Sequence, residues 1–168
     1  FRMIAYASDV DREQHIALVR GDLAGAPPLV RVHSHCLTGD VFASTECDCH
    51  EIIERSLEAI VAEDRGVFVY LHHTGRGFGI DAAAPALGAL PKILYHSRNQ
   101  LDKDIARQRM IQHESGIGAQ IMIDLGLKSL RVLTNHPRKV VALEGYGLTI
   151  TEQVPVLAKS NKRTHQTL

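Results

Sequence analysis

The chain has 168 residues, of which 45% are apolar and 23% are charged, and this is the composition of one ordinary globular domain. Nineteen Lys and Arg balance nineteen Asp and Glu, so the formal net charge is zero. That balance argues against a protein that coats nucleic acid or an anionic membrane. No apolar run approaches the roughly 18 residues of a membrane span, and no secretory signal opens the chain. Because it begins at Phe1 rather than at Met, we expect a fragment of a longer cytoplasmic protein, fused to another domain before Phe1.

The first half of the chain has clear strand and helix patterns. Residues 15–19 form a short apolar run, and residues 29–33 alternate apolar and polar, which predicts a strand. Residues 36–40 are expected to form a loop. Apolar residues at helical spacing then predict a helix from about residue 48 to near Gly66. The continuous apolar run 67–71 predicts a buried strand.

The second half is harder to interpret, because two prolines and a polar run interrupt residues 81–112. A glycine at position 126 is expected to end the helix that precedes it. In chain order we expect a glycine turn over 75–79, weak helices over 81–112, a helix over 117–125, a strand over 130–133, a helix from Pro137 to about Leu143, and a strand over 148–154.

Strands that alternate with helices predict an α/β or α+β fold, with a mixed sheet covered by helices. We expect a single domain over residues 1–156. Residues 157–168 are expected to form a polar C-terminal tail.

The three cysteines of the chain lie close together, at Cys36, Cys47 and Cys49. An odd number at this spacing does not make a disulfide framework. Three thiolates with an open fourth position are typical of a catalytic zinc site, whereas His35 or His50 as a fourth ligand would make the site structural. We expect one zinc ion per chain. The alternative is three unrelated buried cysteines.

Two segments are candidates for holding a phosphate. Residues 75–79 are rich in glycine, so backbone N–H groups can approach an anion, although a plain tight turn is an alternative. Residues 134–139 follow a strand and open a helix, where unpaired N–H groups collect anions, although an ordinary helix start is again the alternative. The candidate phosphate-binding residues are Arg31, Ser34, Gly75, Arg76, Thr134 and Lys139.

Several motifs together resemble GTP cyclohydrolase II, which is also the C-terminal half of bifunctional riboflavin-biosynthesis enzymes. The resemblance covers residues 1–156 and rests on five segments: 31–42 (RVHSHCLTGDVF), 47–49 (CDC), 75–79 (GRGFG), 116–120 (GIGAQ) and 133–139 (LTNHPRK). It implies a zinc-dependent α/β homodimer that opens the imidazole ring of GTP and releases formate and pyrophosphate.

The resemblance carries over to individual residues of the site. It implies that Cys36, Cys47 and Cys49 are the zinc ligands. The positions that match the nucleotide-phosphate site are Arg31, Val32, His33, Ser34, Gly75, Arg76, Thr134 and Lys139.

The chemistry positions depart from the family pattern. Leu87 stands at the tyrosine of the family, Ile111 at its aspartate base and His113 at its arginine nucleophile. Three further polar partners are changed: glutamate to His35, glutamine to Ile52 and glutamate to Thr74.

These departures predict a divergent zinc hydrolase that opens a ring C–N bond of a purine nucleotide or related heterocycle. The expected substrate is a phosphorylated small molecule, and His113 and His35 are the expected replacements for the catalytic groups. One alternative is a catalytically inactive zinc-binding regulatory or scaffold domain. The other is an ordinary GTP cyclohydrolase II.

Overall fold

The computed structural model describes residues 1–9, 13–72, 78–80, 93–95, 105–135 and 143–156, and within these it describes residues 78–80, 93–95 and 105–114 by their backbone. A six-stranded sheet is the centre of the fold, with the strand order β1-β2-β4-β3-β7-β8. Its strands are β1 Arg2–Ala7, β2 Gln14–Arg20, β3 Leu29–Ser34, β4 Gly66–Leu71, β7 Ser129–Leu133 and β8 Thr149–Val154. The other elements are a π-helical turn η1 at Leu37–Val41, helix α1 at Cys49–Ala62, helix α2 at Ile105–Asp124, and a separate antiparallel pair of β5 Phe78–Ile80 and β6 Ile93–Tyr95.

The sheet is mixed, as the sequence predicts. β3 pairs in parallel with β4 and with β7, and β7 pairs in parallel with β8. β1 and β2 complete the sheet on one side through antiparallel pairing. The carboxyl ends of β4, β3, β7 and β8 therefore meet at one edge of the sheet, which we call the carboxyl edge.

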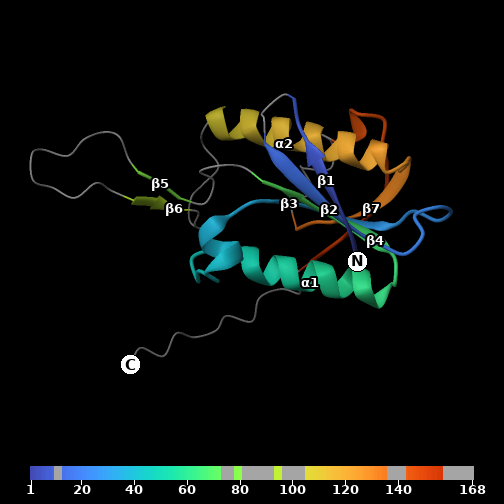
Figure 1. The fold of residues 1–168 in the computed structure, drawn as a ribbon, viewed down its shortest axis with the longest axis horizontal. Helices are drawn as coiled ribbons and strands as arrows, with labels where there is room; N and C mark the ends of the chain where they lie inside the picture. The colour runs from blue at the N-terminus through green and yellow to red at the C-terminus, as the bar shows by residue number, and fades with distance from the viewer. Residues whose placement is uncertain (10–12, 73–77, 81–92, 96–104, 136–142, 157–168) are drawn as a thin grey trace, which may run out of the picture.

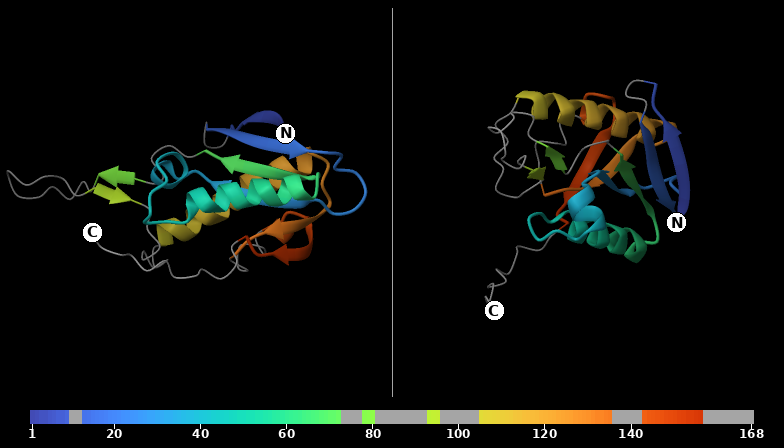
Figure 2. Two further views of the ribbon diagram at one scale, coloured as in Figure 1. Left: turned by 90° about the horizontal axis from the view of Figure 1, so that it is seen from below. Right: turned by 60° about the vertical axis from the view of Figure 1, so that its left-hand side comes forward.

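Two helices cover the two faces of the sheet (Figures 1 and 2), α2 on one face and α1 on the other. Along β4, Val67 and Val69 pack in the core on the α2 side, while Phe68 between them packs with Ile60 of α1. The strand is apolar on both faces because a helix covers each of them.

Helix α2 is longer than the sequence predicts. It begins at Ile105 instead of near Ile117, and it passes through Gly116 and Gly118 without a break. A Cβ at Gly118 would lie 3.2 Å from Cγ1 of Val32, and one at Gly116 would lie 2.6 Å from the Tyr146 hydroxyl. The two glycines weaken the intrinsic helix preference but allow the helix to pack closely on its neighbours.

The other expected elements divide into three groups. The structure confirms the predicted strands and the first predicted helix, although α1 ends at Ala62, before Gly66. The expectation of weak helices over 81–112 is wrong at residues 93–95, which form a strand. It is right at residues 105–112, which are helical as the first part of α2. Of the predicted glycine turn, residues 75–77 lie outside the described residues, and residues 78 and 79 belong to strand β5 instead. The helix from Pro137 lies outside them up to residue 142, and the polar tail lies outside them entirely. None of the helices in the described part of the chain is long and apolar enough to cross a membrane.

Gly66 lets β4 begin directly beside β3, and its replacement tests this packing. Its φ is +154°, and a Cβ there would lie 2.5 Å from the carbonyl oxygen of Leu29. We expect Gly66→Ala to lower the free energy of unfolding by about 3 kcal/mol, because backbone strain and a steric clash combine. Gly25→Ala is the matched control, since Gly25 has φ +92° but open space around the Cβ position, and it should cost about 1 kcal/mol. Urea unfolding of both variants measures the difference, and equal losses would contradict the clash.

Candidate metal centre

The carboxyl edge of the sheet brings together segments that are far apart in the sequence. Cys36 follows β3, His72 follows β4 and Thr134 follows β7. In sheets of this kind, ligands bind outside the carboxyl ends of the parallel strands. This edge is therefore the candidate site.

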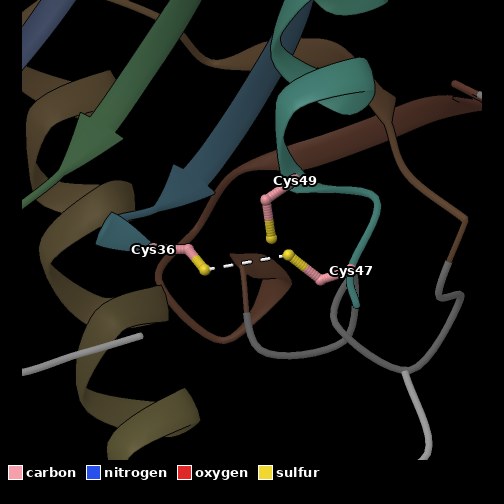
Figure 3. Close-up of side chains that lie close together, drawn as sticks. All are labelled: Cys36, Cys47 and Cys49. Carbon is pink, nitrogen blue, oxygen red and sulfur yellow. Dashed lines mark hydrogen bonds between the residues drawn. The ribbon is translucent and has the colours of Figure 1, made fainter. Parts of the chain in front are cut away.

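Three cysteines form a compact cluster at this edge, which we call the thiol cluster: Cys36, Cys47 and Cys49. All three side chains are buried, and none of them forms a disulfide bond. Their sulfur atoms point toward one another (Figure 3), with 4.0 Å between Sγ of Cys36 and Sγ of Cys47 and all three within 4.8 Å. A disulfide bond would require about 2.05 Å. The cluster confirms the sequence prediction that these residues lie together.

The dimensions of the thiol cluster fit a zinc ion. Sulfurs that bind one tetrahedral zinc at about 2.3 Å lie about 3.8 Å from one another, close to the separation of Cys36 and Cys47. The chain also leaves room at the centre. A Cβ on Gly39 would lie 2.6 Å from Sγ of Cys47 and 2.7 Å from Cβ of Cys49. A soft donor set in a space of this size suits zinc.

The electrostatics of the cluster also favour a cation. A hydrogen bond with Cys36, followed by burial, raises the pKa of the Cys49 thiol, and burial raises the pKa of the Cys47 thiol. The Cys49 backbone N–H, at the N-terminus of α1, opposes this by donating a hydrogen bond to the Cys47 sulfur. Three thiolates are therefore stable together only when a positive ion shares the site.

Neither histidine that could close the site does so in the described residues. The group of side chains able to hold a metal there contains the three cysteines and no histidine. Nδ1 of His50 is 3.4 Å from the Asp40 carbonyl oxygen, and its Nε2 is 3.5 Å from Glu54. His35 instead hydrogen-bonds Tyr70. The described part of the site thus has the three-ligand pattern that is typical of catalytic zinc.

Asp40 lies at the centre of a hydrogen-bond network beside the thiol cluster. Its Oδ1 is 3.0 Å from Nε2 of His33, and its Oδ2 accepts hydrogen bonds from the Cys36 backbone N–H and the Tyr70 hydroxyl, each at 2.8 Å. The Tyr70 oxygen is also 2.6 Å from Nδ1 of His35. Burial alone would raise the pKa of Asp40, but these hydrogen bonds together lower it. A buried carboxylate thus holds the start of the metal-binding loop.

Arg31 places a positive charge near the thiol cluster. It lies on β3, and its Nη1 donates a hydrogen bond to the Leu133 carbonyl oxygen at 3.0 Å. Burial lowers the pKa of this guanidinium to about 10, while the charge of Cys49 opposes the shift. Arg31 is therefore still charged at neutral pH, and its Nε is buried with no hydrogen-bond partner among the described residues.

The remaining predicted site residues are only partly described. Ser34 ends β3, and Thr134 follows β7 at the same edge with its N–H bonded to the Val154 carbonyl. The His33 side chain is buried and bound to Asp40. The backbone of α2 includes Ile111 and His113, whose side chains are not described, and five predicted site positions lie outside the described residues: Thr74, Gly75, Arg76, Leu87 and Lys139. The substrate contacts of all these residues stay predictions.

Three residues that the sequence patterns do not indicate also lie at this edge: Asp40, Tyr70 and Glu13. Asp40 carries one signal, a carboxylate beside a glycine in the loop after a cysteine. Tyr70 carries none, because only the pairing of β4 with β3 brings it opposite His33. Glu13 lies far from the motifs in sequence and reaches Nδ1 of His72 at 3.1 Å.

Comparison with known proteins identifies the family. Residues 1–155 match the family model described as GTP cyclohydrolase II. The chain belongs to the GTP cyclohydrolase II family. It is 44% identical over 163 residues to the riboflavin biosynthesis protein RibBA of Bacillus mycoides (strain KBAB4), an alignment that covers 93% of this chain and 39% of the relative.

Two further RibBA proteins give the same result. The protein of Nocardia farcinica is 44% identical over 164 residues, covering 96% of this chain and 39% of the relative. That of Bacillus subtilis (strain 168) is 41% identical over 188 residues, covering 99% and 42%. The chain therefore spans about two fifths of the length of the curated relatives that it matches. In this chain the thiol cluster has the residues for a metal site, and Gly39 provides a test of it.

We expect Gly39→Ala to weaken zinc binding by about tenfold or more, because the new methyl group would push the sulfurs apart. Competition between the metal-free protein and a coloured chelator measures the dissociation constant. Gly25→Ala serves as the control, since a Cβ at that position meets nothing within 4 Å. Equal affinities for the two variants would contradict a metal bound within the cluster.

Proposed function

We propose that this chain is a zinc-dependent GTP cyclohydrolase II of riboflavin biosynthesis. In this proposal, the thiol cluster holds one zinc ion, and the imidazole ring of GTP is opened with release of formate and pyrophosphate. The observation that carries the proposal is a buried three-thiol cluster, open to a fourth ligand in the described residues, in a chain that belongs to this family. The names of the relatives, which refer to riboflavin biosynthesis, support it further.

The residues around the cluster have separate tasks in this proposal. Zinc, when bound, supplies a Lewis acid and activates water for attack on the ring carbon. Arg31 offsets the negative charge of the thiolates, and Asp40 holds the loop that carries Cys36. Ser34 and Thr134 lie at the same edge as the cluster, where they would meet the nucleotide.

Proton transfer and phosphate binding are assigned to residues predicted from the sequence. Ile111 cannot act as a base, so we assign the acid–base work to His113 and His35, whose imidazoles titrate near neutral pH in the unperturbed state. We assign the binding of the phosphate groups to Arg31, His33 and Ser34 and to four residues of the two candidate anion-binding segments. These four are Gly75, Arg76, Thr134 and Lys139.

The comparisons favour GTP over the altered substrate that the sequence departures predict. The family match runs over residues 1–155, and the relatives are 41% to 44% identical along nearly the whole chain. The departures at Leu87, Ile111 and His113 are the reason to test the other two functions directly. The resemblance further implies a homodimer in the cytoplasm, and both properties, like a fused domain, are part of the proposal.

Turnover of GTP by zinc-loaded protein is the decisive experiment. We expect about one zinc per chain by metal analysis, and formate, pyrophosphate and a ring-opened product from GTP by mass spectrometry. Cys47→Ser should lower both the zinc content and the rate, because one of three ligands is lost. Full zinc occupancy in a variant with serine at all three cysteines would contradict the metal assignment. Zinc without turnover of any nucleotide would indicate a scaffold, and opening of a different nucleotide would indicate the altered substrate.

Phosphate recognition gives an independent prediction. We expect Arg76→Ala and Lys139→Ala each to weaken the binding of a non-hydrolysable GTP analogue by about 1.5–3 kcal/mol, the range for charged hydrogen bonds. Titration calorimetry measures these affinities. Arg55→Ala is the control, because Arg55 is an exposed residue of α1 that pairs with Glu51. If all three variants bind like the unmodified chain, Arg76 and Lys139 are ordinary surface charges.

A further inference from the structure

We propose that Asp40 and Tyr70 are positioning residues that fix the ring tautomer of His35, so that its Nε2 is a hydrogen-bond acceptor at the carboxyl edge, beside the thiol cluster. The atom would accept a hydrogen bond from an N–H donor of a purine ring or from a water molecule. The use of this acceptor for GTP rests on the proposed function. The tautomer itself does not.

Both side-chain oxygens of Asp40 act as hydrogen-bond acceptors. Oδ2 is 2.8 Å from the backbone nitrogen of Cys36, and a backbone N–H can only donate. The same oxygen accepts the Tyr70 hydroxyl at 2.8 Å, and Oδ1 faces Nε2 of His33 at 3.0 Å. Both oxygens of Asp40 therefore face hydrogen-bond donors, as an ionised carboxylate requires.

Tyr70 has a single proton, and Asp40 receives it. Burial and the hydrogen bond to Asp40 both raise the pKa of this phenol, so it stays protonated at neutral pH. The Tyr70 oxygen has no second proton to give to Nδ1 of His35, which lies only 2.6 Å away. The hydrogen bond between them must therefore run from the His35 Nδ1–H to the tyrosine oxygen.

This direction determines where the neutral imidazole of His35 carries its lone pair. With the proton on Nδ1, the lone pair is on Nε2. By the same reasoning, His33 donates its Nε2–H to Asp40. Asp40 thus holds His33 directly and His35 through Tyr70, and the two imidazoles are in opposite tautomers.

The ring of His35 lies at the candidate site. The residue directly precedes Cys36, and its backbone N–H bonds the Leu71 carbonyl oxygen at 2.8 Å. Its ring centroid is 5.0 Å from that of His72, and its ring stands edge-on to the ring of Tyr70. Because Asp40 also holds the Cys36 backbone N–H, the same residue orients the metal-binding loop and the imidazole beside it.

The test is a ring-nitrogen spectrum of zinc-loaded protein labelled with ¹⁵N-histidine, recorded at mildly alkaline pH. Long-range ¹H–¹⁵N correlations distinguish a protonated ring nitrogen from one with a lone pair, and the loss of signals in His35→Gln assigns the residue. We expect a protonated Nδ1 and an unprotonated Nε2 for His35, and the reverse for His33. A His35 protonated on Nε2 in the unmodified chain would overturn the proposal without any variant.

Tyr70→Phe tests the positioning role, with Tyr6→Phe as the matched control. Tyr70→Phe removes the acceptor of Nδ1, so the His35 proton should move toward Nε2, while zinc content stays at one per chain because Asp40 still holds Cys36. Tyr6 is a tyrosine of β1 that hydrogen-bonds Asp124, and its loss should leave the His35 spectrum unchanged. Identical His35 spectra in the two variants would overturn the role of Tyr70.

The kinetic measurement separates this proposal from the proposed function. If the chain turns over GTP, Tyr70→Phe should lower kcat/KM by about tenfold or more at full zinc content, since a positioned base contributes about 10²–10⁴ in rate, and Tyr6→Phe should not. Unchanged kinetics in Tyr70→Phe would overturn the positioning role. If no variant turns over GTP while His35 has the expected tautomer, the proposed function fails and the tautomer assignment stands.

Discussion

The buried carboxylate of Asp40 is the interaction on which the candidate site depends. It accepts hydrogen bonds from the Cys36 backbone and the Tyr70 hydroxyl and faces His33, so it connects the loop after β3 to the neighbouring strand β4. A buried carboxylate costs free energy unless its lone pairs are satisfied. The loop that carries the first metal ligand is therefore held in one arrangement by groups that the carboxylate itself requires.

The surroundings of the thiol cluster disfavour ionisation of its side chains, whereas those of Asp40 favour it. Burial and the nearness of the other thiols raise the pKa of Cys47 and Cys49, so the metal-free cluster favours neutral thiols. The N-terminus of α1, with the Cys49 N–H directed at Cys47, and the cationic Arg31 oppose this. A bound divalent cation would offset the remaining negative charge of the thiolates, so metal binding is coupled to the local structure. The carboxyl edge of the parallel strands is where these separate groups converge.

His35 lies beside the metal ligand Cys36 and is also relevant to substrate recognition. It stands where the family motif has a glutamate, and the hydrogen-bond network would give it an acceptor nitrogen. A carboxylate and an imidazole with a lone pair on Nε2 both accept hydrogen bonds. This change is therefore compatible with family membership over residues 1–155. The departures at Leu87, Ile111 and His113 have no such counterpart among the described side chains, and they make the GTP assay decisive.

The sequence by itself determined the fold class, most of the strands, helix α1 and the three cysteines, because hydrophobic periodicity and ligand spacing are local properties of a chain. It did not determine the start of α2, because Gly116 and Gly118 have poor helix propensity and the tight packing on Tyr146 and Val32 overrides it. Nor did it determine the open fourth position, since His35 and His50 were equally near in sequence. Only tertiary structure decided that the ring of His35 bonds Tyr70 and that Nδ1 of His50 faces the Asp40 carbonyl oxygen, because strand pairing and loop closure set which polar groups meet.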